Sequence, residues 1–130
     1  SDNFLAVLVL LSLITIFIIY EKRKGGVKVD TSEMTRLINK GNPYVYDLRS
    51  AAEYGTGSVA GALNLQPSNL VKQDVLFKAS EEDCIILICK TGTTSSKSAG
   101  ELKKQGFTNV NVLSGGMTNW TQSGMPLVKN

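Results

Sequence analysis

The pattern of apolar and polar residues divides the chain into two unlike parts. Residues 4–20 hold fifteen apolar residues out of seventeen, interrupted only by Ser12 and Thr15, and none is charged. As a helix, this run measures about 26 Å at ~1.5 Å per residue, and runs of ~17–25 residues usually cross a bilayer. Three basic residues, 22–24, follow almost directly. The pattern predicts an N-terminal transmembrane anchor with a basic juxtamembrane segment over residues 1–24.

The residues around the apolar run favour an uncleaved anchor over two alternatives. A cleavable signal peptide carries positive charge before the run and a small-residue cleavage site after it, and neither pattern is present. A buried core helix is disfavoured because the run abuts a dense charge cluster. The positive charge lies on the C-terminal side, so we expect that side to be cytoplasmic and the basic residues to contact anionic lipid headgroups.

The remaining residues alternate between strand-like and helix-like patterns. Residues 84–89 give the strongest strand signal, because an unbroken apolar run is typical of a strand covered on both faces. Shorter strands are expected at 27–29, 44–48, 62–65 and 110–113, and helices at about 30–41, 50–54, 67–77, 95–105 and 117–122. Strands alternating with helices predict an α/β fold with a mainly parallel central sheet flanked by helices, in one domain over residues 27–130.

Composition narrows the function classes. Fourteen Lys and Arg against eleven Asp and Glu give a net charge of +3, too small to make nucleic acid the default partner. The absence of His excludes Ser-His-Asp and Cys-His catalysis and histidine-ligated metal sites. Two Cys cannot build a four-thiolate zinc site. We therefore expect no metal, no cofactor and no nucleic-acid partner.

Cys89 lies at the carboxyl end of the predicted central strand, where open α/β sheets bind their ligands. The segment from Lys90 to Ser95 holds one cation, a glycine and a run of small hydroxyl residues. Small residues let the backbone wrap so that N–H groups point inward, and the following helix adds its positive N-terminus. We expect such a loop to favour the reactive thiolate.

Both interpretations of Cys89 stay open on the residues alone, because a cysteine that ends an apolar strand can equally be inert core. Cys84 is expected to be structural. It lies five residues from Cys89 along a strand, so the two side chains face opposite sides, ~16 Å apart. A disulfide tolerates only ~4.4–6.8 Å between Cα atoms.

Four separated segments resemble the single-domain rhodanese-like sulfurtransferases. Residues 46–54 (YDLRSAAEY) resemble the family stretch D-x-R-x-x-x-E-[FY], and residues 57–65 (GSVAGALNL) resemble G-H-I-x-G-A-x-N-[IL]. Residues 89–95 (CKTGTTS) resemble the active loop C-[RK]-x-G-x-[RT]-S. Residues 113–116 (LSGG), with Trp120, Pro126 and Leu127, resemble the closing pattern. An anchor followed by one such domain is similar to a bacterial architecture, which implies a single-pass protein of the bacterial inner membrane.

The resemblance implies a persulfide mechanism. Cys89 would attack the sulfane sulfur of thiosulfate or another donor, and would pass the sulfur to a thiol acceptor, a protein thiol included, or to cyanide. Lys90 would steer the anionic donor, and Thr94 and Ser95 would add hydroxyl donors and cap the next helix. The loop implied to cradle the persulfide consists of Lys90, Thr91, Gly92, Thr93, Thr94 and Ser95.

Asp47 and Arg49 match the first family segment, and the resemblance implies a supporting role in loop order and salt bridging. Arg49 is four residues from Glu53, a spacing that allows an ion pair on a helix.

One position departs from the family pattern, and a second takes the uncharged of its two usual residues. Ser58 replaces the usual His, which puts the packing of that loop in doubt more than sulfur transfer. Thr94 stands where many members have Arg. Our hypothesis is that the missing cation shifts donor preference from small dianions toward persulfides.

Two other functions compete with sulfur transfer. A phosphatase or arsenate reductase needs an Arg to grip its oxyanion, six positions after the cysteine, and position 95 is Ser. A non-catalytic, membrane-tethered binding module with a rhodanese fold is the main alternative. Such modules usually lack the cysteine, which is present here.

Overall fold

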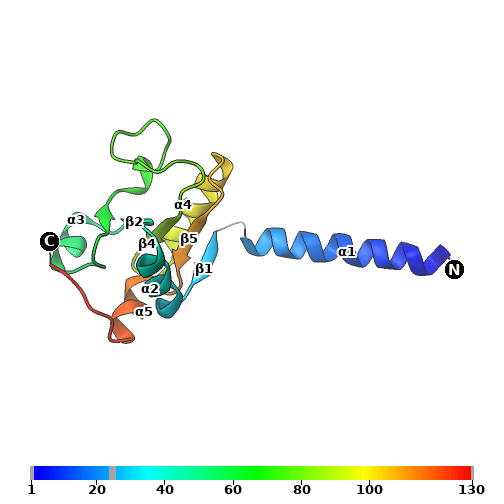
Figure 1. Ribbon diagram of the computed structural model, residues 1–130, viewed down its shortest axis with the longest axis horizontal. Helices are drawn as coiled ribbons and strands as arrows, with labels where there is room; N and C mark the ends of the chain where they lie inside the picture. The colour runs from blue at the N-terminus through cyan, green and yellow to red at the C-terminus, as the bar shows by residue number, and fades with distance from the viewer. Residues whose placement is uncertain (1, 24–25, 130) are drawn as a thin grey trace.

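The computed structural model describes residues 2–23 and 26–129. Figure 1 shows one long helix, α1 (Asp2–Arg23), lying apart from a sheet that is packed between helices. We expect Gly25 and Gly26 to break the helix after the apolar run; Gly25 lies outside the described residues, and Gly26 has a φ of +84°. The side chains of the basic residues 22–24 also lie outside the described part of the chain.

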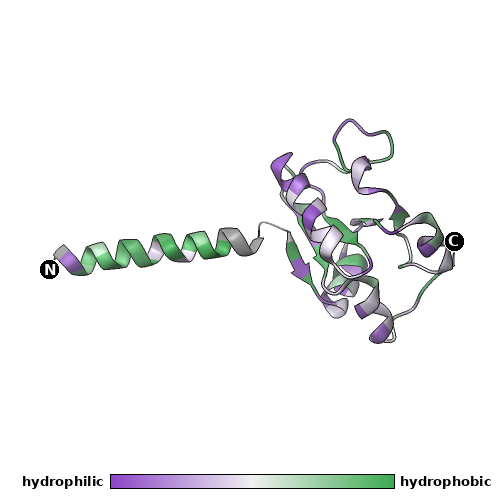
Figure 2. Cartoon of the chain, turned by 180° about the vertical axis from the view of Figure 1, so that it is seen from behind, coloured by the Kyte–Doolittle hydropathy of each residue, from purple (hydrophilic) through white to green (hydrophobic). Residues whose placement is uncertain are grey.

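The apolar run forms most of α1, and Figure 2 shows hydrophobic residues along its length. Nevertheless, no helix in the described residues is long and apolar enough to cross a membrane. The uncharged run corresponds to about 26 Å of helix, less than the ~30 Å hydrocarbon core. The predicted transmembrane helix, and with it the single-pass localisation in an inner membrane, is therefore wrong.

Five parallel strands form one sheet in the order β1-β5-β4-β2-β3. Their bounds are Val27–Val29 (β1), Tyr44–Asp47 (β2), Leu63–Asn64 (β3), Ile85–Ile88 (β4) and Val110–Leu113 (β5). The central strand, β4, pairs with β5 on one side and β2 on the other. The prediction of a parallel α/β fold is confirmed, and parallel pairing brings the carboxyl ends of all five strands to one edge.

Helices cover both faces of this sheet. All four residues of β4 have no exposed surface, which explains the unbroken apolar run in that strand. On one face, α4 (Thr93–Lys104) packs Ala99 and Leu102 against Leu87. On the other, α2 (Thr31–Lys40) and α5 (Gly116–Gln122) pack Met34 and Trp120 against Ile86 and Ile88. The four residues of β4 therefore alternate between two separate cores.

Side-chain caps start two of the shorter helices. The Asp30 carboxylate accepts a hydrogen bond from the Glu33 amide at 2.7 Å at the start of α2. Ser50 and Glu53 form a reciprocal capping box at the start of α3 (Ala51–Thr56). Both caps satisfy backbone donors that lack partners inside the helix.

The helix predicted over residues 67–77 is wrong. Only a short 3-10 turn, η1 (Pro67–Asn69), forms there. The Asp74 side chain accepts hydrogen bonds from Asn69 Nδ2 at 3.0 Å and from the Leu76 amide at 2.8 Å. Asp and Asn side chains that bond nearby groups compete with the helical ladder, so the segment turns instead of continuing.

Candidate active site around Cys89

Strand β4 delivers Cys89 to the carboxyl edge of the sheet, and α4 begins four residues later at Thr93. The turn between them depends on Gly92, whose φ of +99° lies in the left-handed region that favours glycine. Gly92 is also the N-cap of α4, and it makes no side-chain cap. The expectation that Thr94 and Ser95 cap this helix is therefore wrong, because both already lie inside its first turn.

Two backbone amides point at the sulfur of Cys89. The Gly92 N–H donates to Sγ at 3.0 Å and the Ser95 N–H at 3.4 Å. Cys89 is buried, with 4% of its surface exposed, so these donors act on the sulfur with little competition from water. Inward-pointing amides at a helix N-terminus stabilise negative charge. The sulfur thus lies in an environment suited to a thiolate or a persulfide anion.

The other loop side chains take distinct positions. Lys90 and Thr94 are exposed. The hydroxyls of Thr91 and Thr93 lie 3.5 Å apart, within hydrogen-bond reach. Ser95 is fully buried, and its Oγ has no hydrogen-bond partner among the described residues.

Helix α5 fixes the backbone of the Cys89 loop by hydrogen bonds. The sequence analysis did not predict this role. The Met117 N–H donates to the Cys89 carbonyl at 2.9 Å, and the Thr118 N–H and hydroxyl each donate to the Lys90 carbonyl at 3.0 Å. Gly116 makes this approach possible, since a Cβ atom on it would lie 2.4 Å from the Cys89 carbonyl oxygen. The sequence analysis placed Gly115 and Gly116 only in the closing family pattern. A second consecutive glycine at a strand-to-helix junction is the signal that could have revealed it.

Asp47 and Arg49 form a buried ion pair beside β4. Arg49 Nη2 lies 2.8 Å from Asp47 Oδ2, and their side chains are 9% and 0% exposed. The same Nη2 donates to the Gly57 carbonyl at 2.7 Å. Arg49 is thus committed to Asp47, whereas Glu53, the partner that its spacing allowed, belongs to the capping box of Ser50. The pair ties β2 to the loop that follows α3.

The family model of the rhodanese-like domain matches residues 30–123. The chain belongs to the rhodanese-like domain family. Among its relatives, the uncharacterized protein YibN of Escherichia coli K12 is 34% identical over 112 residues, which cover 85% of this chain and 78% of YibN. A sulfurtransferase of Allochromatium vinosum is 28% identical over 102 residues, or 78% of this chain and 94% of that protein.

Solved structures agree on the fold. The human single-domain sulfurtransferase TSTD1 superposes with a TM-score of 0.66 at 22% identity, over 73% of this chain and 95% of that chain. At this identity the likeness establishes the rhodanese-like architecture alone.

In this rhodanese-like domain, Ser58 stands where the family motif places His, and its loop is well packed. Ser58 is fully buried. Its backbone forms an isolated antiparallel bridge with Val128, with N–H···O distances of 2.9 and 2.8 Å in the two directions. Backbone pairing with the C-terminal segment therefore fixes the loop at a position where the His side chain is absent.

Cys84 lies apart from the site. It packs with the core on the α2 and α5 side, whereas Cys89 belongs to the core on the α4 side. Burial raises the pKa of the Cys84 thiol, which keeps it in the unreactive form. The prediction that the two cysteines face opposite sides is confirmed.

Proposed function

We propose that this rhodanese-like domain is a sulfurtransferase that carries sulfur as a persulfide on Cys89. The observation that carries the proposal is the convergence of the Gly92 and Ser95 amides on Sγ. Hydrogen bonds to a charged acceptor are about twice as strong as neutral ones. The loop therefore offers two backbone donors to the negative charge of a thiolate nucleophile, and the chain has no histidine to serve as a base.

The first half-reaction loads the enzyme. The Cys89 thiolate attacks the outer, sulfane sulfur of thiosulfate. A new S–S bond forms to Sγ, and the S–S bond within thiosulfate breaks. Sulfite leaves with that electron pair, and Cys89 becomes a persulfide anion. Before the step the negative charge lies on Sγ, at which the amides of Gly92 and Ser95 point. After the step it lies on the outer sulfur, one S–S bond away. Lys90, the next residue along the chain, is an exposed cation.

The second half-reaction transfers the outer sulfur of the Cys89 persulfide to an acceptor. An acceptor thiolate attacks the outer sulfur of the Cys89 persulfide and forms its own persulfide, while the electron pair of the broken bond returns to Sγ as thiolate. Cyanide as acceptor yields thiocyanate by the same exchange. Neither half-reaction needs an external oxidant or reductant, and a metal or organic cofactor has no role in it.

Relatives support this function over a binding module. The Allochromatium vinosum relative is named a sulfurtransferase, and it is matched over 94% of its length. The alternative, a non-catalytic module, has no need for a nucleophile under two converging amides. The phosphatase alternative lacks its Arg, because Ser95 occupies that position with a buried hydroxyl.

Intact-mass spectrometry tests the proposal directly. After incubation with thiosulfate or a low-molecular-weight persulfide, the full chain is expected to gain the mass of one sulfur atom. Cys89→Ser should gain none, and Cys84→Ser, the matched control, should gain it fully. A chain that gains no sulfur from either donor would be a binding module. Faster loading from the persulfide than from thiosulfate would support the donor preference that we attribute to Thr94.

A further inference from the structure

The hydroxyl of Thr118 bonds across to the Cys89 loop instead of back to its own helix. Thr118 lies in the first turn of α5, and its hydroxyl donates to the Lys90 carbonyl, 28 residues away along the chain, at 3.0 Å. Hydroxyls inside helices commonly bond to the carbonyl four residues earlier. Four others in this chain do so at 2.8–3.0 Å, those of Ser12, Thr15, Thr35 and Thr121.

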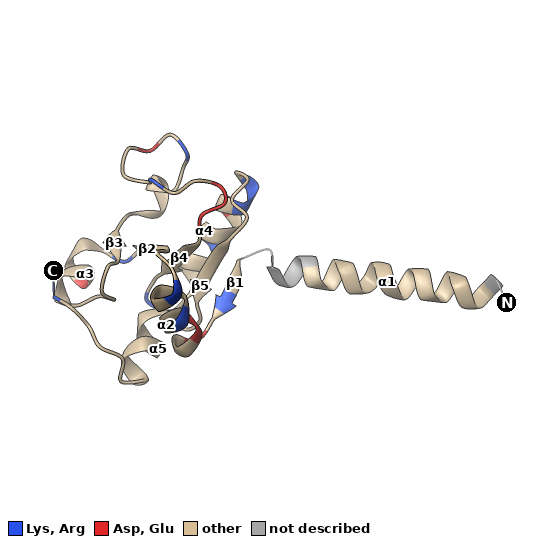
Figure 3. Ribbon diagram, in the orientation of Figure 1, with Lys and Arg blue, Asp and Glu red and all other residues tan. Residues whose placement is uncertain are grey.

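The Lys90 carbonyl oxygen accepts two hydrogen bonds from this one residue. The Thr118 N–H also donates to it at 3.0 Å, because the first amides of a helix have no acceptor within the helix. A carbonyl oxygen has two lone pairs, so Thr118 can occupy both. Figure 3 shows no charged residue on α5, and the contact therefore acts through hydrogen bonds alone. It fixes the direction in which the Lys90 carbonyl points.

The direction of the Lys90 carbonyl also determines where the next amide points. A trans peptide is planar, and its C=O and N–H point in opposite directions. The described residues contain no cis peptide bond. Since the Lys90 carbonyl points toward α5, the Thr91 N–H of the same peptide points away from α5.

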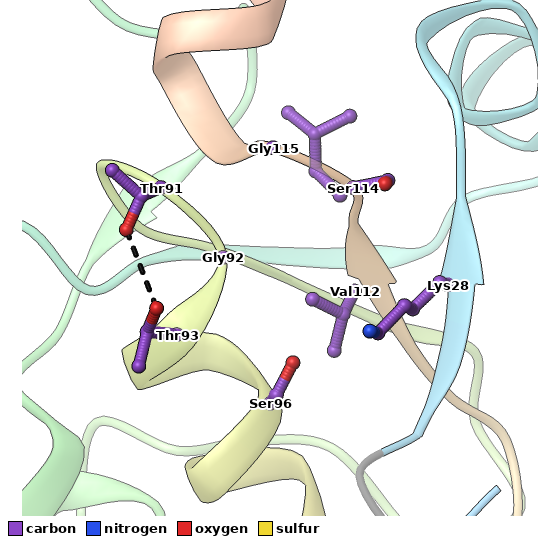
Figure 4. Close-up of a pocket in the computed structure, with 9 residues that line it drawn as sticks. Lys28, Thr91, Gly92, Thr93, Ser96, Val112, Ser114 and Gly115 are labelled. Carbon is purple, nitrogen blue, oxygen red and sulfur yellow. Dashed lines mark hydrogen bonds between the residues drawn. The ribbon is translucent and has the colours of Figure 1, made fainter. Parts of the chain in front are cut away.

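Open space borders the loop at this peptide. A cavity of about 180 Å³ lies beside the loop, and its lining includes Thr91, Gly92 and Lys28 of β1 (Figure 4). This space would let the peptide between Lys90 and Thr91 turn over if α5 released the carbonyl. Turning would exchange the directions of the N–H and the C=O, and would point the carbonyl oxygen away from α5.

We infer that Thr118 is a positioning residue for the Cys89 nucleophile, and that its hydroxyl keeps the Lys90 carbonyl turned toward α5. The inference rests on the proposed function, in which Cys89 carries negative charge. A carbonyl oxygen turned into the loop would oppose that charge, whereas the present orientation leaves the Gly92 and Ser95 amides to act on it. Thr118 acts through Lys90 and takes no part in the exchange of S–S bonds.

Alkylation of Cys89 by iodoacetamide tests the inference without sulfur transfer. All variants carry Cys84→Ser, so a single thiol remains, and mass spectrometry follows the rate at neutral pH. Thr118→Val replaces the hydroxyl by a methyl group, and Thr118→Ala removes it without a replacement. Both should react about twofold to tenfold more slowly than the Cys84→Ser parent, the factor that one hydrogen bond contributes. Thr118→Ser should restore the rate.

The direction of the change separates positioning from general loosening of the loop. Cys89 is buried, with 4% of its surface exposed, so a loop that merely loosens would expose the sulfur and speed alkylation. Thr121→Val is the matched control, because it removes an exposed hydroxyl of the same helix that bonds only to the Met117 and Thr118 carbonyls within α5. Its rate should equal that of the parent.

Three results overturn the inference: an unchanged or faster rate in Thr118→Val and Thr118→Ala, equal slowing by Thr121→Val, or no recovery in Thr118→Ser. Alkylation needs no sulfur donor. Failure of the sulfur-loading experiment and failure of the Thr118 assignment are therefore distinguishable.

Discussion

Replacing Gly116 with alanine tests how the fold holds Cys89 in place. Gly116 has a φ of +60°, and a Cβ atom there would lie 2.4 Å from the Cys89 carbonyl oxygen and 2.7 Å from the Lys90 carbonyl carbon and oxygen. These are backbone atoms of the active loop, so no flexible side chain can move aside. The methyl group must displace either the loop or α5, whose Met117 and Thr118 amides bond the same two carbonyls.

The expected cost has two parts. A non-glycine residue in the left-handed region costs about 1–2 kcal/mol. Inserting a methyl group into packed structure costs about 1–3 kcal/mol more. Gly116→Ala should thus lower the free energy of unfolding by about 2–5 kcal/mol. Gly124→Ala is the matched control, since Gly124 has a φ of +72° but open space around its Cβ position. Gly124→Ala should lower the free energy of unfolding only by the cost of the left-handed backbone, about 1–2 kcal/mol.

Urea denaturation measures both variants, with Trp120 as probe because it is the single tryptophan of the sequence and is buried. Sulfur transfer is then assayed where both variants are fully folded. Displacement of the loop should reduce the rate of Gly116→Ala by about tenfold to a hundredfold, while Gly124→Ala keeps the wild-type rate. Equal stabilities and equal rates for the two variants would refute the argument that close contact at Gly116 positions the loop.

Two further predictions concern buried groups. Asp47→Ala leaves the Arg49 guanidinium buried without its partner, so it should lower the free energy of unfolding by about 3–5 kcal/mol. Adding Arg49→Met should recover part of this loss. If urea titrations show that the losses of the two single variants simply add in the double variant, the two residues have no interaction energy and the prediction fails. Burial raises the pKa of the Cys84 thiol, so this thiol ionises at a lower pH in the unfolded chain than in the folded one. Its contribution to the free energy of unfolding is therefore lost as pH rises. The stability advantage of wild type over Cys84→Ala should therefore shrink above about pH 8.5, the ordinary thiol pKa, and a constant difference would contradict that assignment.

Sequence patterns predicted the local structure correctly where a single residue or a single run of residues determines it. The unbroken apolar run of residues 84–89 indicated a strand with both faces covered, and β4 is fully buried. The hydroxyl-rich segment after Cys89 indicated a tight loop before a helix, and α4 begins there. By contrast, residues 67–77 were predicted to be helical because Pro67 suits the first turn of a helix. Side-chain bonds of Asn69 and Asp74 ended that helix after one turn, and such competition does not register in periodicity.

The sequence by itself determined the parallel α/β class, the place of Cys89 at the end of the central strand, and the small residues that let the loop fold tightly. Only the tertiary structure decided which groups meet there. It brought Gly116 of α5 against the Cys89 carbonyl and placed Lys28 of β1 in the same cavity lining as Gly92, although Gly116 and Lys28 lie far from Cys89 along the chain. The physical reason is that local backbone preferences act over a few residues, whereas these contacts arise from parallel pairing that gathers separate strand ends at one edge of the sheet.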